Sequence, residues 1–243
     1  MKDVAFKVGN NQLKGSLFYP SPLKDKNPAV LFIHGWTSAQ DRYSDQAKNL
    51  NDLGVICLTF DLRGHGISDG NINAQSRQNF LDDTLCAYDF LVSDKNVDPN
   101  SITIIGSSFG AYLALLLTRH REVKRLILRV PANYLNSNFN EPQIKYSDKL
   151  ETLKWRYEVK NPQDTFALAA LHNFEGDVLI IESGEDKIIS HQTIQNYLDA
   201  VKDQSKLDHI VMKGAPHSLS GYPEFKKQFQ QITYNWLEAK LND

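Results

Sequence analysis

The sequence has few of the features that hold a chain in a membrane or cross-link it. It contains two cysteines in 243 residues, too few for a disulfide framework, and no Cys/His spacing of the kind that binds zinc. No stretch approaches the roughly 18 apolar residues of a transmembrane helix, and the first residues show no apolar core or cleavage site of a signal peptide. We therefore expect a cytoplasmic protein with no membrane span and no metal, in which Cys57 and Cys86 are reduced core residues.

An excess of charge of either sign is also absent. The 27 Lys and Arg residues nearly balance the 29 Asp and Glu residues, which leaves a formal net charge of −2. Such a chain lacks the basic footprint of a protein that binds nucleic acid or an anionic membrane. With 41% apolar residues, the composition is that of an ordinary globular protein. We therefore expect no nucleic-acid partner.

Short apolar runs alternate with helical patterns along most of the chain. Residues 4–8 and 13–19 predict a hairpin around a turn at 9–11. Further strands are predicted at 29–33, 55–60, 102–105, 125–130, 178–181 and 207–212, and helices at 38–53, 77–92, 108–119, 191–201 and 225–241, with a turn at 98–100. Continuous apolar strands separated by helices indicate a mostly parallel sheet covered on both faces. We expect one α/β domain over residues 1–243.

The segment 131–173 interrupts this alternation. It contains no clear buried strand but is rich in aromatic residues, namely Tyr134, Phe139, Tyr146, Trp155, Tyr157 and Phe166. Structureless loops of this length are uncommon in compact domains and usually form lids or binding loops. We expect a small helical cap over one end of the sheet. The alternative, a pair of ordinary helices that pack on the core, stays open.

The sequence Gly-Ser-Ser-Phe-Gly at 106–110 predicts a nucleophile. It follows a predicted strand directly and precedes an apolar helix, which is the strand–turn–helix context of a G-x-S-x-G nucleophile elbow. Glycines two residues before and after the serine remove side chains that would clash in so sharp a turn. The motif places the nucleophile at Ser108 rather than at Ser107.

A serine hydroxyl needs a base to take its proton and an acid to hold that base. His217 follows the predicted strand 207–212, and Asp186 lies in the loop after the strand 178–181. The carboxyl ends of parallel strands meet at one edge of a sheet, so these groups can converge with Ser108. We favour Asp186 as the acid because of the Gly184-x-Asp186 spacing, with Glu182 as the main alternative and Glu185 as a further competitor.

The loops after two earlier strands contain His34-Gly35-Trp36 and the glycine-rich segment 61–70. In this architecture the first loop and the residue after the nucleophile supply oxyanion donors, which here are the backbone N–H groups of Trp36 and Phe109. His34 and His65 are expected to brace their loops. The glycine-rich segment matches neither a P-loop nor a dinucleotide fingerprint, so a phosphate site is not favoured.

Together, the motifs at 34–36, 61–68, 106–110, 184–186 and 214–217 resemble those of the α/β-hydrolase superfamily, over essentially the whole chain. The resemblance implies an eight-stranded, mostly parallel sheet with an antiparallel entry, a Ser108–His217–Asp186 triad and no cofactor. The loops look most like those of small serine esterases, including feruloyl and cinnamoyl esterases, and share features with monoglyceride lipases and acyl thioesterases.

From these residues we expect a serine hydrolase that cleaves a small-molecule carboxylic ester through an acyl-enzyme intermediate. The near-neutral net charge suits uncharged esters rather than polyanions. A serine at the elbow argues against dehalogenase and epoxide hydrolase chemistry, which use an aspartate there. Acyl thioesterase and peptidase activity on the same triad stay open, as does a non-catalytic receptor for small molecules built on this fold.

Overall fold

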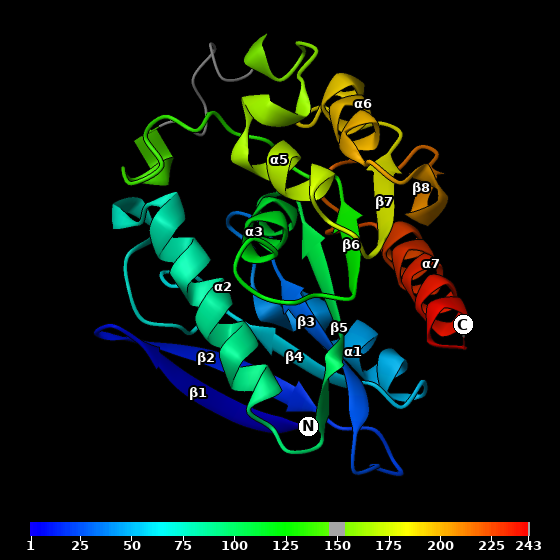
Figure 1. Ribbon diagram of the computed structural model, residues 1–243. Helices are drawn as coiled ribbons and strands as arrows, with labels where there is room; N and C mark the ends of the chain where they lie inside the picture. Colours follow the sequence, from blue (N-terminus) through cyan, green and yellow to red (C-terminus); the bar gives the residue numbers. More distant parts are fainter. Residues whose placement is uncertain (146–153, 243) are drawn as a thin grey trace.

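The computed structural model describes residues 1–145 and 154–242 and contains one eight-stranded sheet (Figure 1). In spatial order the strands are β1 (Lys2–Val8), β2 (Asn11–Phe18), β4 (Ile56–Phe60), β3 (Asn27–Ile33), β5 (Val97–Ser107), β6 (Arg125–Arg129), β7 (Asp177–Ser183) and β8 (Leu207–Met212). β2 pairs antiparallel with both β1 and β4, and every pairing from β4 to β8 is parallel. The predicted hairpin and mostly parallel sheet are confirmed.

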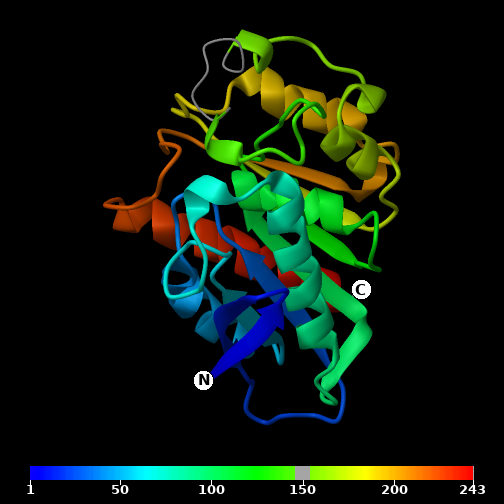
Figure 2. The ribbon, with the colours of Figure 1, turned by 90° about the vertical axis from the view of Figure 1, so that its left-hand side faces the viewer.

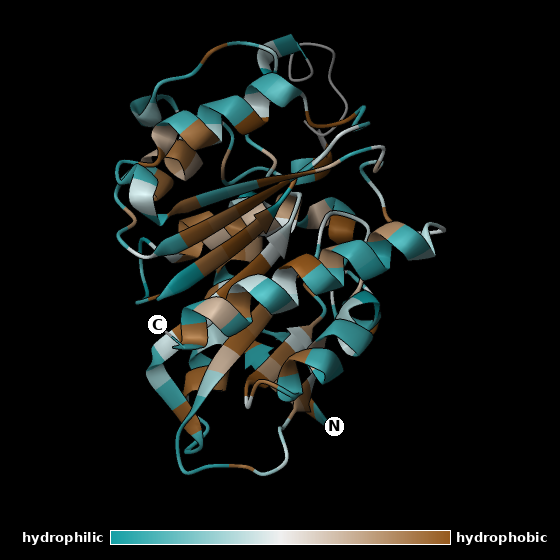
Figure 3. Cartoon of the chain, turned by 90° about the vertical axis from the view of Figure 1, so that its right-hand side faces the viewer, coloured by the Kyte–Doolittle hydropathy of each residue, from teal (hydrophilic) through white to brown (hydrophobic). Residues whose placement is uncertain are grey.

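Helices cover both faces of this sheet. One face carries α1 (Ser44–Asn51) and α7 (Pro223–Asn242), and the other carries α2 (Arg77–Val92), α3 (Phe109–Leu117), α5 (Phe166–His172) and α6 (His191–Ala200). Within β3, Leu31 packs on one side while Val30 and Phe32 pack on the other, because successive strand residues point to opposite faces. Figure 3 shows apolar strands between helices whose outer surfaces are hydrophilic.

Two local predictions were wrong. Residues 98–100, expected as a turn, lie inside β5, where Val97 pairs with Asn27 and Ile102 with Ala29, so the intervening residues form a bulge. The Asp98 carboxylate accepts a hydrogen bond from the amide of Asn100 (3.0 Å), which gives the bulge the local hydrogen bond of a turn. The helix expected at 38–53 begins with a 3₁₀ turn at Gln40–Tyr43 and becomes α-helical at Ser44.

The described part of 131–173 combines the two expected arrangements. Its last helix, α5, buries Ala167, Leu168 and Leu171 in the main core, as an ordinary covering helix does. Short 3₁₀ turns at Gln143–Lys145 and Pro162–Asp164 lie at the end of the molecule to which β5, β6 and β7 point (Figures 1 and 2). Tyr146 lies outside the described residues. The cap itself stays a prediction.

Both cysteines are free, but they differ in burial. Cys57 is fully enclosed in the core, whereas Cys86 is only partly buried and its thiol donates to the carbonyl of Lys7, so the core placement was right for one of the two. Across the described ranges, the helices are too short or too polar to cross a bilayer.

Candidate active site

Ser108 sits in a strained turn between β5 and α3. Its backbone angles, φ 53° and ψ −114°, lie in a region that L-residues rarely adopt. A Cβ on Gly106 would lie 2.6 Å from the Ala111 Cα, and one on Gly110 would lie 2.1 Å from the Ile33 carbonyl oxygen. The two flanking glycines are therefore needed for the close approach of strand, turn and helix, as the motif predicted.

His217 and Asp186 form a hydrogen-bonded pair. The His217 Nδ1 lies 2.7 Å from the Asp186 Oδ2, although 31 residues separate them in sequence. The other carboxylate oxygen accepts the amides of Ile188 and Ile189, both at 2.8 Å. The Asp186 side chain is almost fully buried and that of His217 is 18% exposed. The acid is thus fixed by its own loop, and the imidazole keeps its Nε2 edge available.

Ser108 and His217 line one cleft of about 850 Å³, together with Trp36, Tyr134 and Arg129. Within the described residues, the Ser108 hydroxyl makes no hydrogen bond. The cleft is bordered by residues from both halves of the sheet. The structure therefore brings Ser108, His217 and Asp186 to one end of the molecule, while their catalytic roles stay a prediction.

The alternative acids are placed elsewhere. Glu182 is buried at the end of β7 and its two oxygens face His191 (2.8 Å) and His209 (3.2 Å). Glu185 is exposed, and its amide donates to the carbonyl of Ala215. Neither carboxylate contacts His217 among the described residues, so the geometry favours Asp186.

The predicted oxyanion donors lie beside Ser108. Trp36 lines the cleft, and Phe109 is the first residue of α3, where helix amides lack intrahelical acceptors. Across residues 1–145 and 154–242, neither amide has a hydrogen-bond acceptor. The Trp36 ring packs edge-on against Phe80 and Phe109, so the side chain is structural while the amide is left free.

His34 and His65 brace the neighbouring loops. The His34 Nε2 accepts the Leu62 amide and its Nδ1 donates to the Gly35 carbonyl; the His65 Nε2 accepts the Thr37 amide and its Nδ1 donates to the Arg63 carbonyl. Burial lowers the pKa of His34 to about 3 and also lowers the pKa of His65. Both rings are therefore neutral, and both their nitrogens are engaged by backbone.

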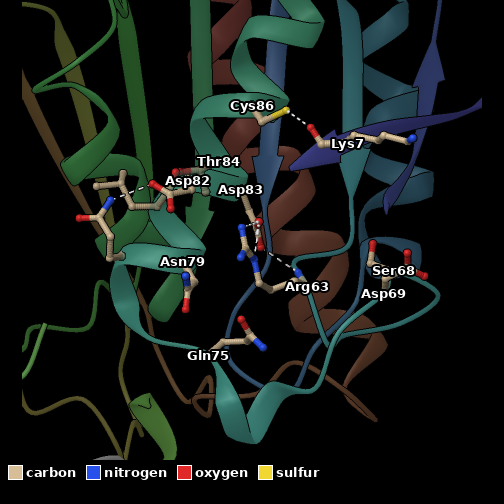
Figure 4. A network of polar contacts seen from close by, with 12 residues as sticks. Lys7, Arg63, Ser68, Asp69, Gln75, Asn79, Asp82, Asp83, Thr84 and Cys86 are labelled. Carbon is tan, nitrogen blue, oxygen red and sulfur yellow. Dashed lines mark hydrogen bonds and ion pairs between the residues drawn. The ribbon is translucent and has the colours of Figure 1, made fainter. Parts of the chain in front are cut away.

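The loop at 61–70 is held by internal contacts rather than shaped for a phosphate. Its amides at Gly64, His65 and Ser68 donate to carbonyls of the same loop, and that of Ile67 donates to the Asp61 carboxylate. Figure 4 shows how Arg63 fastens this loop to α2 through Asp83, with Nε 2.7 Å from one carboxylate oxygen. Burial raises the pKa of Asp83 to about 6 in spite of this ion pair.

Arg129, at the end of β6, is a site residue that the sequence analysis missed. Its Nη2 donates to the Ser183 hydroxyl (2.9 Å) and to the carbonyls of Pro216 (3.1 Å) and His217 (2.7 Å). Burial lowers the pKa of Arg129 to about 10, so the guanidinium is still cationic at neutral pH. Arg129 thus fixes the backbone that carries His217. A charged residue at the end of an apolar strand was the available signal.

Metal ligands do not gather in this region. Among the residues that the structure describes, no group of three or more His, Cys, Asp or Glu side chains is placed to hold a metal ion.

Comparisons with known proteins show the family to which the chain belongs. Residues 24–169, more than half of the chain, match the family described as serine aminopeptidase, S33. A palmitoyl-protein thioesterase from Homo sapiens, ABHD10, is 26% identical over 222 residues, covering 81% of this chain and 69% of that protein. An uncharacterized protein of Mycobacterium tuberculosis is 25% identical over 217 residues, covering 89% of this chain and 72% of its own length.

Solved structures with this fold include Est1E from Butyrivibrio proteoclasticus with bound ferulic acid. It has a TM-score of 0.76 and 18% identity, and the match covers 99% of this chain and 100% of that one. A monoacylglycerol lipase from Paleococcus ferrophilus has a TM-score of 0.69 and 16% identity, with 93% of this chain and 98% of that chain covered. At such identities these structures establish the shared fold.

Proposed function

The chain belongs to the serine aminopeptidase S33 family of α/β hydrolases, and from this premise we propose that it cleaves carboxylic esters, with Ser108 as nucleophile, His217 as base and Asp186 as acid. The observations that carry the proposal are the His217–Asp186 pair and a serine on a strained turn, with the serine and the histidine lining one cleft. That arrangement provides the three roles that acyl transfer through a serine requires.

In the proposed reaction the Ser108 Oγ attacks the acyl carbon while the Nε2 of His217 takes its proton. Asp186 accepts the Nδ1 hydrogen, which fixes the tautomer and stabilises the imidazolium. The Trp36 and Phe109 amides bind the oxyanion, and losing such a donor typically costs about 10²–10³-fold in turnover. His217 then returns the proton to the leaving alcohol, and water releases the acyl group by the same steps.

We propose an ester substrate because the cleft is open to small molecules and is partly apolar, with Trp36, Tyr134 and Ile189 on its walls. The described parts of 131–173 contribute Tyr134 and Arg156 to those walls, which supports a cap within a single domain. A thioester is the second candidate, because one relative is a palmitoyl-protein thioesterase. Both substrates use the same attack on an acyl carbon.

The test compares Ser108→Ala with Ser107→Ala, which removes the neighbouring hydroxyl of the same motif. Ser108→Ala should fold normally, lose labelling by a fluorophosphonate probe and lose about 10⁴–10⁶-fold in kcat on p-nitrophenyl acetate. Ser107→Ala should keep labelling and turnover. Wild-type turnover by Ser108→Ala would overturn the nucleophile assignment.

A panel of matched oxygen esters, thioesters and peptides then sets the substrate class. Faster turnover of thioesters would favour the second candidate. Labelling of the wild-type protein followed by a single acylation without further turnover would favour a receptor over an enzyme.

A further inference from the structure

The charged side chains that line the cleft are all basic. Arg42, Arg129, Arg156 and Lys226 border it, and the lining contains no aspartate or glutamate among the described residues. The whole chain has a net charge of −2, so this local composition is opposite in sign to that of the protein. A cleft lined by one sign of charge concentrates ligands of the other sign.

For three of these four basic residues, the structure shows what stabilises the positive charge: a hydrogen-bond acceptor, an ion-pair partner or water. Arg129 holds the backbone of Pro216 and His217 as described above. The Lys226 ammonium pairs with Asp45 at 3.0 Å, at the outer edge of the cleft. Arg42 is exposed to water at the rim of the cleft, so its positive charge loses little hydration free energy.

Arg156 is different. It is 6% exposed, yet no aspartate or glutamate of the described chain contacts it, and its Nε has no hydrogen-bond partner. The guanidinium lies over the Tyr134 ring, 5.3 Å from the centroid, and Arg77 lies 5.6 Å from the same centroid. The surroundings of Arg156 thus include a second cation and an aromatic ring rather than an anion.

A second guanidinium does not compete for a ligand of Arg156. Arg77 donates to the carbonyls of Leu135 and Ser137, which places it in the scaffold of the segment after β6. The backbone of Arg156 is fixed as well, because its carbonyl accepts the hydroxyls of Ser190 and Thr193. Arg156 is therefore held at the cleft wall by its main chain, and its guanidinium, which hydrogen-bonds the Tyr134 side chain, faces no carboxylate among the described residues.

Burying a charged group without a counter-charge is costly, and a guanidinium binds carboxylate or phosphate oxygens through two parallel hydrogen bonds. We propose that Arg156 binds an anionic group, a carboxylate or similar oxyanion, on the substrate that Ser108 attacks. The inference rests on the proposed ester hydrolysis and narrows its substrate class to esters with a negatively charged acyl or alcohol part. It also replaces the expectation of uncharged esters. That expectation came from the net charge of the whole chain, whereas the charged residues that line the cleft are all basic.

The kinetic test uses matched charged and neutral esters with Arg156→Gln. In one arm, mono-p-nitrophenyl glutarate carries the anion on the acyl side and its methyl ester is the neutral counterpart. In the other, 4-acetoxybenzoate carries it on the alcohol side and its methyl ester is the counterpart. The wild-type protein should prefer the anionic ester in one arm, and Arg156→Gln should lower kcat/KM for that ester by about 10- to 100-fold while the neutral ester changes little.

Two further variants separate recognition from general damage. Arg119→Gln removes a guanidinium that lies over the Phe166 ring outside the cleft and should leave the preference intact. Arg156→Lys keeps the charge but loses the two-pronged geometry and should restore part of the preference. Equal loss on neutral and anionic esters in Arg156→Gln, or no preference in either arm, would overturn the assignment.

A binding measurement keeps the inference separate from the chemistry. Ser108→Ala should bind mono-p-nitrophenyl glutarate or 4-acetoxybenzoate more tightly than the neutral counterpart by titration calorimetry, and adding Arg156→Gln should remove that difference. If the wild-type protein turns over no ester but this difference is present, the proposed function fails and the anion site stands. If esters are cleaved but the difference is absent, the anion site fails and the proposed function stands.

Discussion

At the same edge of the sheet, the His34–His65 pair and the His217–Asp186 pair differ in the partners of their imidazole rings. In the His34–His65 pair, rings 4.9 Å apart are buried and all four ring nitrogens are engaged by backbone amides and carbonyls. In the His217–Asp186 pair, one ring nitrogen meets a carboxylate and the imidazole is partly exposed in the cleft. The difference lies in the partners of the rings, because all three residues follow strands that end at this edge.

The difference in partners distinguishes a histidine that fixes loops from a histidine that can take up a proton. A ring that uses both nitrogens in backbone contacts fixes loops but has no site for a transferred proton. A ring that is held at Nδ1 by a carboxylate can take a proton at Nε2 and becomes more stable when it does.

The largest effect is expected for His217→Ala. Without its base, Ser108 should lose about 10⁴–10⁶-fold in kcat on p-nitrophenyl acetate, as measured from initial rates at saturating substrate. The midpoint of urea unfolding should change little, because the side chain is partly exposed and has one side-chain partner.

His65→Ala is the matched control for that variant. It removes a buried ring that touches His34, Trp36 and Phe80, so the free energy of unfolding should fall by about 2–4 kcal/mol. Its kcat should fall far less than that of His217→Ala. A comparable loss of kcat in both variants would contradict the division between support and chemistry.

A smaller loss is expected for Asp186→Asn. An amide in place of the carboxylate no longer stabilises the imidazolium and disturbs the tautomer of His217, so kcat should fall by about 10³–10⁴-fold. Steady-state rates on the same ester measure the loss. Glu182→Gln is the comparison, because this carboxylate contacts His191 and His209 instead, and its kcat should stay close to that of the wild type. The opposite ranking would make Glu182 the acid.

The buried pair should make stability depend on pH. The pKa of His34 is about 3 in the folded protein and near 6.5 in an unfolded chain, so the unfolded state binds an extra proton below pH 6.5. The stabilising contribution is fully present above pH 6.5 and is lost as the pH falls toward 3, by about 1.4 kcal/mol per pH unit. By pH 4.5 the loss from His34 alone should reach about 2–3 kcal/mol.

Urea unfolding of the wild type and of His34→Gln between pH 4.5 and 7.5 measures this loss. The glutamine keeps an acceptor for the Leu62 amide but does not titrate. The stability difference between the two proteins should therefore shrink with falling pH. Parallel stability curves would show that His34 is not the group responsible.

Much of this contrast was visible in the sequence, because it depends on where strands end. The apolar runs placed a strand before each of the loops that carry Trp36, Ser108, Asp186 and His217, and the parallel sheet brings those loops to one edge. The expected fold is confirmed, and the predicted site residues lie together. Their catalytic roles stay predictions.

Other features depend on contacts that a local pattern does not contain. The bulge at 98–100 is a turn by composition, and only the pairing of β5 with β3 places it inside a strand. Arg129 looks like the polar end of a short strand, because its acceptors at Ser183, Pro216 and His217 lie 54 or more residues away. The burial of Arg156 against Tyr134 likewise depends on a tertiary contact that the local sequence does not show. Tertiary neighbours decide each of these positions.

The smallest effect is expected for Arg129→Gln, which tests whether Arg129 positions the loop that carries His217. The guanidinium fixes the carbonyls of Pro216 and His217, and a glutamine reaches fewer of these acceptors, so the imidazole should be placed less well over Ser108. We expect kcat to fall by about tenfold with KM nearly unchanged, and the rate of fluorophosphonate labelling to fall in parallel.

Arg129→Lys should recover part of the rate, because an ammonium can still reach one carbonyl. The control, Arg121→Gln, removes a partly exposed arginine that pairs with Asp89 and should leave both rates unchanged. An Arg129→Gln protein that loses stability but labels at the wild-type rate would show that the His217 loop holds its geometry without this arginine.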